Sequence, residues 1–220
     1  MLWNGEFAYI YMPRTASRSL CVHFVQNWKG PVFGTASQGH VNEIVKSVTK
    51  PNFVSVGRGH ENLVQAKLIL SKFGRTFTQF KKIIFVVRNP YDLVLSNYYF
   101  LKQSYPTNKN NKNCIIANES NFEEFCLRFS HPDVRNWFML DGTVLGNMQI
   151  IRYEHLKDDL SLVEEFSSLN IDSISHYNKI PRNEDMSAVL TVKAESIIYE
   201  AYQHLFAFGQ YRRETIEAQQ

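Results

Sequence analysis

Apolar residues follow two patterns along this chain: short continuous runs, and longer stretches with helical spacing. The continuous runs predict strands over residues 7–12, 52–56, 83–87 and 148–153. The helical spacing predicts helices over residues 17–28, 61–73, 90–102, 122–129, 157–169 and 187–206. Strands that alternate with helices in this way are typical of an α/β fold, in which helices flank a central parallel sheet with right-handed crossovers.

The sequence also predicts which residues are buried in one strand and in one helix. The run over 83–87 is apolar at every position, as expected of a central parallel strand that is covered on both faces. In the helix over 61–73, Gly74 is expected at the C-terminal cap. Four apolar residues of that helix are expected to face the core: Leu63, Val64, Leu68 and Ile69.

Residues 103–118 differ from the rest of the chain. They are polar, rich in Asn and Lys, and without periodicity. This composition predicts a loop or insertion that is either mobile or part of a substrate lid. A chain of 220 residues is long enough for one well-packed domain, so we expect a single domain, residues 1–220, that carries this insertion.

The composition excludes several classes of protein. An apolar fraction of 44% with 14% aromatic residues excludes a disordered chain. The net charge of +3 is small and the basic residues are spread along the sequence, so no nucleic-acid partner is expected. No apolar run approaches the roughly 20 residues that a membrane span needs, and the first residues lack a signal-peptide core. We therefore expect a cytoplasmic protein without a membrane span.

The number and spacing of the cysteines bear on metal binding and on the redox compartment. Cys21, Cys114 and Cys126 are an odd number without metal-site spacing, so we expect no metal and a reducing compartment. Cys21 falls on the apolar side of the helix over 17–28, which predicts a buried thiol.

A polar turn at residues 13–19 separates the first predicted strand from the first helix. The free N–H groups at a helix start, together with a guanidinium, can bind one anion there. The candidate residues of this turn are Arg14, Thr15, Ala16, Ser17, Arg18 and Ser19. The Gly-x4-Gly-Lys-Ser/Thr sequence of ATP and GTP sites is absent. The alternative is an ordinary helix start with Ser17 as the capping residue and the arginines in solvent.

A second polar turn follows the central strand. Arg88 ends that strand and Ser96 lies two turns into the next helix, at the edge of the sheet where open α/β folds bind ligands. The alternative is that Arg88 pairs with a carboxylate such as Asp92. His60 follows another strand at the same edge, where it is either a surface or capping residue or a general base.

Together these segments resemble the sulfotransferase family that uses 3′-phosphoadenosine 5′-phosphosulfate (PAPS). Pro-Arg-Thr-Ala-Ser-Arg-Ser at residues 13–19 is similar to the family's 5′-phosphosulfate loop, Pro-Lys-Thr-Ala/Gly-x-x-Ser. Val-Arg-Asn-Pro-Tyr-Asp at residues 87–92, with Ser96, is similar to its 3′-phosphate motif. Gly-Arg-Gly-His at residues 57–60 and the segment 96–102 are most similar to the heparan sulfate 2-O-sulfotransferase branch of the carbohydrate sulfotransferases.

The resemblance implies a P-loop-like three-layer α/β/α fold and metal-free transfer of a sulfuryl group from PAPS to an acceptor hydroxyl, with a carbohydrate favoured. Carried over by position, the turn that contains Arg14 holds the 5′-phosphosulfate, Arg88 and Ser96 hold the 3′-phosphate, and His60 is the acceptor base. The family usually has Lys where this chain has Arg14. Arginine cannot plausibly donate a proton, but it can bind two phosphosulfate oxygens at once.

Two other functions stay open from the sequence. A relative that binds PAPS or its product, 3′-phosphoadenosine 5′-phosphate (PAP), without catalysis is favoured by Arg14. A P-loop nucleotide kinase shares the strand, turn and helix start, but the missing Gly-Lys-Ser/Thr and the absence of a strand-terminal Asp for Mg²⁺ speak against it. The acceptor pocket is expected in loops, chiefly residues 103–118 and the stretch before His60.

Overall fold

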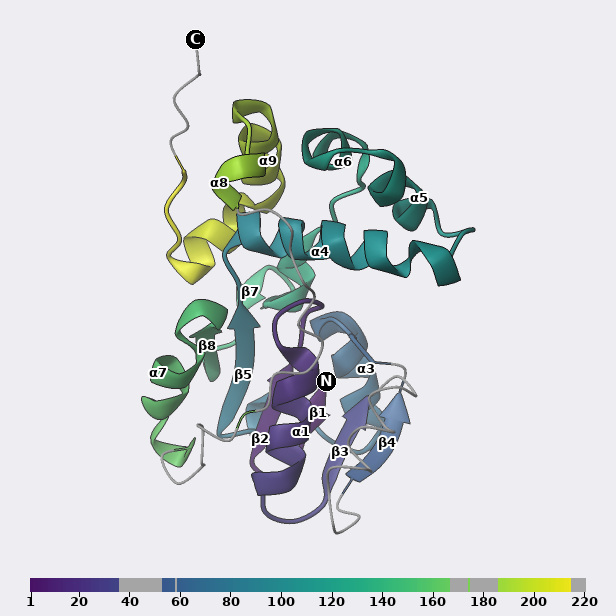
Figure 1. Ribbon diagram of the computed structural model, residues 1–220. Helices are drawn as coiled ribbons and strands as arrows, with labels where there is room; N and C mark the ends of the chain where they lie inside the picture. The colour runs from purple at the N-terminus through teal and green to yellow at the C-terminus, as the bar shows by residue number, and fades with distance from the viewer. Residues whose placement is uncertain (36–52, 58, 167–173, 175–185, 215–220) are drawn as a thin grey trace. The chain divides into compact units, whose positions relative to one another are not determined.

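The computed structural model describes residues 1–35, 53–57, 59–166, 174 and 186–214 (Figure 1). These residues form two compact units. The first contains Met1–Val87 and Arg135–Asn178, and the second contains Arg88–Val134 and Lys179–Gln220. Asn52, Arg58 and residues 167–169, which belong to predicted elements or motifs, lie outside the described residues.

A six-stranded sheet forms the centre of the first unit. Its order is β4 (Phe53–Gly57), β3 (Val32–Thr35), β1 (Leu2–Trp3), β2 (Phe7–Ile10), β5 (Lys82–Val87) and β8 (Met148–Arg152). The pairs β3–β4, β2–β5 and β5–β8 are parallel, whereas β1 is antiparallel to both of its neighbours. The predicted α/β fold with a central, mostly parallel sheet is confirmed. β1 and β3 were not predicted, because β1 has two residues and β3 has only two apolar residues before Gly34 and Thr35.

Strand β5 is the central strand that its sequence predicts. It lies between β2 and β8, with Phe85 paired to Ile10 on one side and Ile150 on the other. Its five apolar residues, from Ile83 to Val87, are fully buried. Because both neighbours are parallel and both faces are covered, no position of the strand needs a polar residue.

Helices cover both faces of this sheet. On one face, α1 (Ser17–Asn27) packs Phe24 on the strands, with 5.3 Å between the ring centroids of Phe24 and Tyr9. Phe166, from a later 3₁₀ turn, packs on the same face, with its ring centroid 5.0 Å from that of Phe7. The helix α7 (Leu156–Ser161) contributes Leu160 to the same core. On the other face, Trp3 of β1 contacts Phe73, which follows α3 (Leu63–Lys72).

The buried side of α3 differs from the prediction. Leu63 and Leu70 face the core with Ala66, whereas Val64 and Leu68 are 45% and 62% exposed. The positions i, i+3 and i+7 lie on one side of a helix, and the small Ala66 lets that side approach the sheet. The predicted end of the helix is confirmed: Gly74 has φ 63°, and the N–H groups of residues 74 and 75 donate to the carbonyls of Ser71 and Leu70.

The second unit is helical. Its longest members are α4 (Pro90–Ser104) and α9 (Val192–Gly209), and the others are α5 (Lys112–Glu119), α6 (Phe122–Arg128) and α8 (Met186–Val189). The other four helices, α5, α6, α8 and α9, all pack on α4. Tyr98 of α4 lies at the centre of this packing, because its hydroxyl donates to the carbonyl of Ser120 at 2.9 Å and its ring contacts Phe122 and Phe125.

The expected loop at residues 103–118 is mostly helical. It contains the end of α4, a 3₁₀ turn at Tyr105–Thr107, and most of α5. The side chain of Asn111 caps α5 by accepting from the N–H groups of Asn113 and Cys114. Cys114 and Ile116 are buried, so the helix has an apolar side that its Asn- and Lys-rich composition concealed.

The predicted helix over 187–206 is divided. Thr191 accepts from the N–H of Ala194 and starts α9, which separates it from α8. The predicted helix over 157–169 is α7 followed by a 3₁₀ turn at Glu164–Phe166. The remaining short elements are 3₁₀ turns at Phe77–Gln79, Val134–Trp137 and Tyr153–His155, and a hairpin of β6 (Met139–Leu140) and β7 (Thr143–Val144).

Two features are absent from the described residues. None of their helices is long and apolar enough to cross a bilayer. Nor do these residues bring three or more His, Cys, Asp or Glu side chains together as a metal site.

Candidate nucleotide-binding and catalytic site

The turn between β2 and α1 has an unusual backbone. Arg14 and Ala16 have φ values of 68° and 58°, the left-handed region that side chains other than glycine rarely adopt. A left-handed conformation costs roughly 1–2 kcal/mol for such a residue. Residues in this region concentrate at ligand-binding and catalytic sites, where the surrounding structure holds them in place.

Thr15 anchors this turn. Its side chain is fully buried, and its hydroxyl donates to the carbonyl of Met12 at 2.8 Å. The turn is therefore tied to the residue that follows β2. Arg14 and Ala16, on either side of Thr15, are half-buried.

The start of α1 lacks a polar capping residue. Its N-cap is Ala16, whose methyl group cannot accept a hydrogen bond, and Ser17 is the first helical residue. The alternative in which Ser17 caps the helix is therefore wrong. The helices α3, α4, α6 and α9 instead begin with a side chain that accepts from their own backbone: Asn62, Asn89, Asn121 and Thr191. A helix start with no such acceptor is suited to an external anion.

His60 lies against this turn within the first unit. It follows β4 and Gly59 and has φ 58°. Its ring packs edge-on against Tyr11, with 5.3 Å between ring centroids, and Tyr11 lies three residues before Arg14. The structure thus brings His60 to the end of β2, where the polar turn begins.

Burial lowers the pKa of His60 below its ordinary value of 6.5. The backbone of Tyr11 and the carboxylate of Glu61 act in the opposite direction, while the positive charge of Arg18 lowers the pKa further. A histidine in this environment is neutral at pH 7 and can accept a proton.

Glu61 lies next to the candidate base His60 and is not among the residues that the sequence indicated. It is buried, and its Oε1 accepts from the N–H of Gly59 at 2.9 Å. The bond closes the turn that carries His60, whose left-handed backbone would otherwise be unfavourable. A buried acid directly after a Gly-His pair was the available signal, but its burial is visible only in the fold.

Arg88 and Ser96 belong to the second unit, at the start of α4. Asn89 caps this helix by accepting from the N–H of Tyr91 at 3.0 Å, and Pro90 is the first helical residue. Both Arg88 and Ser96 are buried, at 7% and 6% exposure. Arg88 also forms the ion pair with Asp92 that was the alternative interpretation, at 3.5 Å. A guanidinium carries five N–H donors, so it can bind a carboxylate and a phosphate together.

The two polar turns continue from neighbouring strands. β2 and β5 are paired in parallel, with Ile10 opposite Phe85. Their carboxyl ends therefore lie at the same edge of the sheet, which is where open α/β folds bind their ligands.

Cys21 is buried, as the sequence predicts, and the other two cysteines are buried as well. Cys21, Cys114 and Cys126 are buried and form no disulfide. Burial raises the pKa of Cys21 and of Cys126 to about 12, which keeps both thiols protonated.

A mostly parallel α/β sheet with polar turns after adjacent strands is typical of proteins that bind ligands beyond the carboxyl ends of their strands. The comparisons with known proteins specify the family. The sulfotransferase domain family matches residues 60–171, which is just over half of the chain, so the chain belongs to this family. The matched segment contains His60, Arg88 and Ser96, and it begins after the turn at residues 13–19.

One similar protein is Sulfotransferase 6B1 of Danio rerio. It is 32% identical over an alignment of 104 residues, and the match covers 42% of this chain and 32% of the relative. The chain thus spans about a third of the length of this curated relative. No solved structure matches the chain.

Proposed function

We propose that this protein transfers a sulfuryl group from PAPS to an acceptor hydroxyl. The observation that carries the proposal is the contact of His60 with Tyr11, which places a neutral imidazole beside the left-handed turn at the start of α1. Membership of the sulfotransferase family supports the reaction class.

In this proposal each turn binds one end of PAPS. The polar turn at residues 13–19 offers several donors suited to a phosphosulfate. They are the guanidinium groups of Arg14 and Arg18, the hydroxyls of Ser17 and Ser19, and the backbone N–H groups at the start of α1. Thr15 holds the turn in shape through its bond to Met12. At the start of α4, Arg88 and Ser96 would hold the 3′-phosphate.

His60 acts as the general base in the proposed reaction. It removes the proton of the acceptor hydroxyl while the hydroxyl oxygen forms a bond to sulfur. The bond between sulfur and the bridging oxygen of the 5′-phosphate breaks, that oxygen keeps the electron pair, and PAP leaves as an anion. Arg14 and the amides of α1 stabilise the charge that grows on the bridging oxygen. The proton remains on His60 and passes to solvent after release.

Arg14 supplies charge rather than a proton in this scheme. Its guanidinium stays protonated throughout, and the departing phosphate needs no proton to leave. Replacement of the family's usual lysine by arginine is therefore compatible with transfer.

The proposed acceptor is a carbohydrate hydroxyl. The support comes from the segments at residues 57–60 and 96–102, whose sequences are most similar to those of a heparan sulfate 2-O-sulfotransferase. The second of these segments lies on α4 and begins with Ser96.

The test is transfer from ³⁵S-labelled PAPS to a panel of sugar, phenol, alcohol and peptide acceptors. The unmodified protein should label a carbohydrate, and Arg14→Ala and His60→Ala should abolish the transfer. Tight PAP binding without transfer to any acceptor would support the non-catalytic alternative. Calorimetry completes the test, because a preference for ATP with Mg²⁺ over PAP would overturn the sulfotransferase proposal and favour a kinase.

A further inference from the structure

A buried carboxylate in the second unit collects three hydrogen bonds. Glu195 lies in the first turn of α9 and is 4% exposed. Its Oε1 accepts from the hydroxyl of Tyr91 at 2.7 Å and from Nε of Arg213 at 2.9 Å. Its Oε2 accepts from Nη2 of Arg213 at 2.8 Å. The bidentate contact with Arg213, together with the hydroxyl of Tyr91, lowers the pKa of Glu195 and keeps it ionised.

Arg213 is held on its other side as well. Its guanidinium lies over the ring of Tyr199, 4.3 Å from the centroid. The side chain is half exposed, so its charge is partly screened while its plane is fixed by the carboxylate and the ring. Arg213 is therefore held in place by its contact with Glu195.

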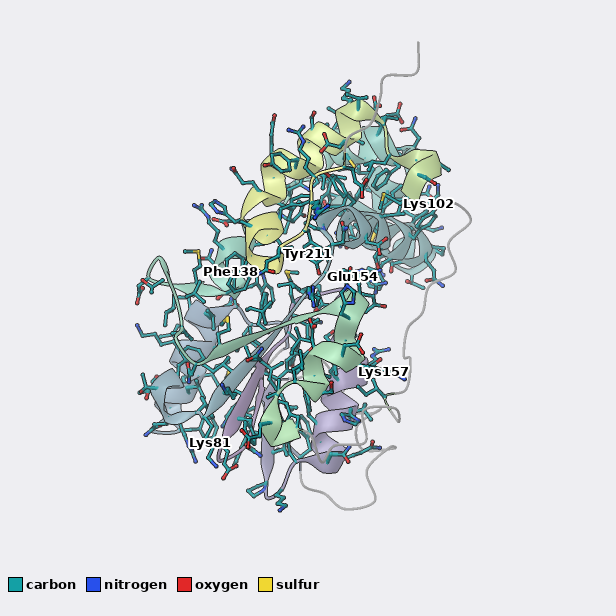
Figure 2. All side chains as sticks on the ribbon, turned by 90° about the vertical axis from the view of Figure 1, so that its left-hand side faces the viewer. Lys81, Lys102, Phe138, Glu154, Lys157 and Tyr211 are labelled. Atoms are coloured by element: carbon teal, nitrogen blue, oxygen red, sulfur yellow. The ribbon has the colours of Figure 1, made fainter. Side chains whose placement is uncertain are left out.

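The same cluster ties the end of the described chain to α4. The chain reverses after α9 at Gln210, which has φ 56°, and Tyr211 begins the segment that follows (Figure 2). The backbone N–H of Glu214 donates to the hydroxyl of Tyr91 at 3.1 Å. The hydroxyl of Tyr91 therefore donates one bond and accepts another, and its buried ring packs at 5.0 Å against Phe206 of α9.

Tyr91 is the second residue of α4, directly after Pro90 and three residues after Arg88. Its backbone N–H is also the donor that Asn89 uses to cap the helix. Any shift of Tyr91 would therefore move the capped first turn and the adjoining Arg88. A buried carboxylate that is bound to Tyr91 and Arg213 resists such a shift, because loss of either of them leaves a less well compensated buried charge.

We propose that Tyr91, Glu195 and Arg213 are positioning residues for the 3′-phosphate turn formed by Arg88 and Ser96. This inference rests on the proposed function, because it takes the 3′-phosphate as the group that Arg88 binds. Arg213 acts through Glu195 and Tyr91, and Glu195 fixes the helix start from α9.

The experiment measures the contribution of the 3′-phosphate alone. Calorimetry gives the Kd of PAP and the Kd of adenosine 5′-phosphate, which lacks the 3′-phosphate. The Kd of adenosine 5′-phosphate divided by the Kd of PAP is the ratio that reports on Arg88. Tyr91→Phe removes only one hydroxyl and keeps the ring, so it is the mildest variant. It should lower the ratio on the order of three- to tenfold, with the Kd of adenosine 5′-phosphate unchanged. Arg213→Ala should lower the ratio further, and Arg213→Lys should restore part of it.

Arg128→Ala is the matched control, because Arg128 pairs with Glu119 on the surface of the same unit at 3.9 Å. Its ratio should equal that of the unmodified protein. A Tyr91→Phe protein with an unchanged ratio overturns the positioning role, and so does an equal loss of affinity for both nucleotides. Arg88→Ala separates this failure from failure of the proposed function: if the ratio survives in Arg88→Ala, the 3′-phosphate assignment itself is wrong.

Discussion

The starts of α1 and α3 lie in the same unit and differ in how their first N–H groups are satisfied. At α3, Asn62 accepts from the N–H of Gln65 at 3.0 Å, and the side chain of Gln65 accepts from the N–H of Asn62 at 3.1 Å. At α1, the corresponding position is Ala16, which has a left-handed backbone and no acceptor. The start of α3 is capped by its own side chains, whereas the start of α1 has no side-chain cap.

The difference separates stability from function. A reciprocal capping box such as that of Asn62 and Gln65 satisfies two backbone donors and stabilises the fold. The turn before α1 instead holds Arg14 and Ala16 in an unfavourable conformation. Such a conformation persists only because the surrounding structure fixes it, here through the bond of Thr15 to Met12. His60 connects the two regions, since it precedes Asn62 by two residues and its ring contacts Tyr11.

The largest expected effect comes from substitution of His60, which connects the starts of α1 and α3. His60→Ala should lower the turnover number on the order of 10²–10⁴-fold, because the acceptor hydroxyl loses its base. His204→Ala is the control, since His204 is exposed on α9, and it should leave the rate unchanged. Transfer assays with labelled PAPS measure both. Full activity in His60→Ala would overturn the assignment of the base.

The pH dependence of the same reaction gives a second measurement of His60. Because burial lowers its pKa below 6.5, the base-competent form persists into mildly acidic solution. The rate should be constant near pH 7 and should fall with decreasing pH only below 6.5, as the ring becomes protonated. An acid limb centred above that value would contradict the burial of the ring. His60→Ala should lose this limb.

The next effect tests the charge at the start of α1. Arg14→Ala should reduce the rate on the order of 10²–10³-fold, because the leaving oxygen loses a fixed cation. Arg14→Lys should keep most of the activity, since it restores a positive charge at the same position. Equal losses in the two variants would mean that the bidentate geometry of the guanidinium matters more than its charge. No loss in Arg14→Ala would remove Arg14 from the catalytic residues.

A smaller effect is expected when the start of α1 is made to resemble that of α3. Ala16→Asp places a carboxylate at the helix start, where it competes with the incoming anion and should weaken PAP binding on the order of tenfold. Ala16→Asn is its neutral control, and both side chains tolerate the left-handed backbone. Calorimetry with PAP should rank the affinities as Ala, then Asn, then Asp. Equal affinity of the Asn and Asp variants would show that no anion approaches this turn.

The smallest effect concerns the closed helix start. Asn62→Ala removes the cap of α3 and should lower the free energy of unfolding by about 1 kcal/mol. Urea denaturation measures this change, with Asn121→Ala in α6 as the equivalent variant in the second unit. Binding of PAP should be unchanged. Loss of PAP affinity at full stability would mean that the start of α3 is part of the ligand site, and the contrast with α1 would fail.

Much of this fold could be predicted from local pattern. The continuous run of β5 indicated a central buried strand, and Pro90 marked the first turn of α4, as the structure has them. The side of α3 was predicted less well, because Val64 and Leu68 are as apolar as the residues that face the sheet. Apolar character shows that a helix has a buried side, but the neighbours decide which stripe is buried when two stripes are similar.

The sequence by itself determined the α/β order of elements and the polar turns that carry Arg14 and Arg88, because these depend on neighbours along the chain. Only the tertiary structure decided the contact of His60 with Tyr11, the bond from Gly59 to Glu61, and the cluster around Glu195. These contacts join residues through burial and hydrogen bonding that local pattern does not specify. Tyr91 and Glu195, for example, are separated by 104 positions. The physical reason is that a buried polar group must find a partner, and the fold alone brings that partner within reach.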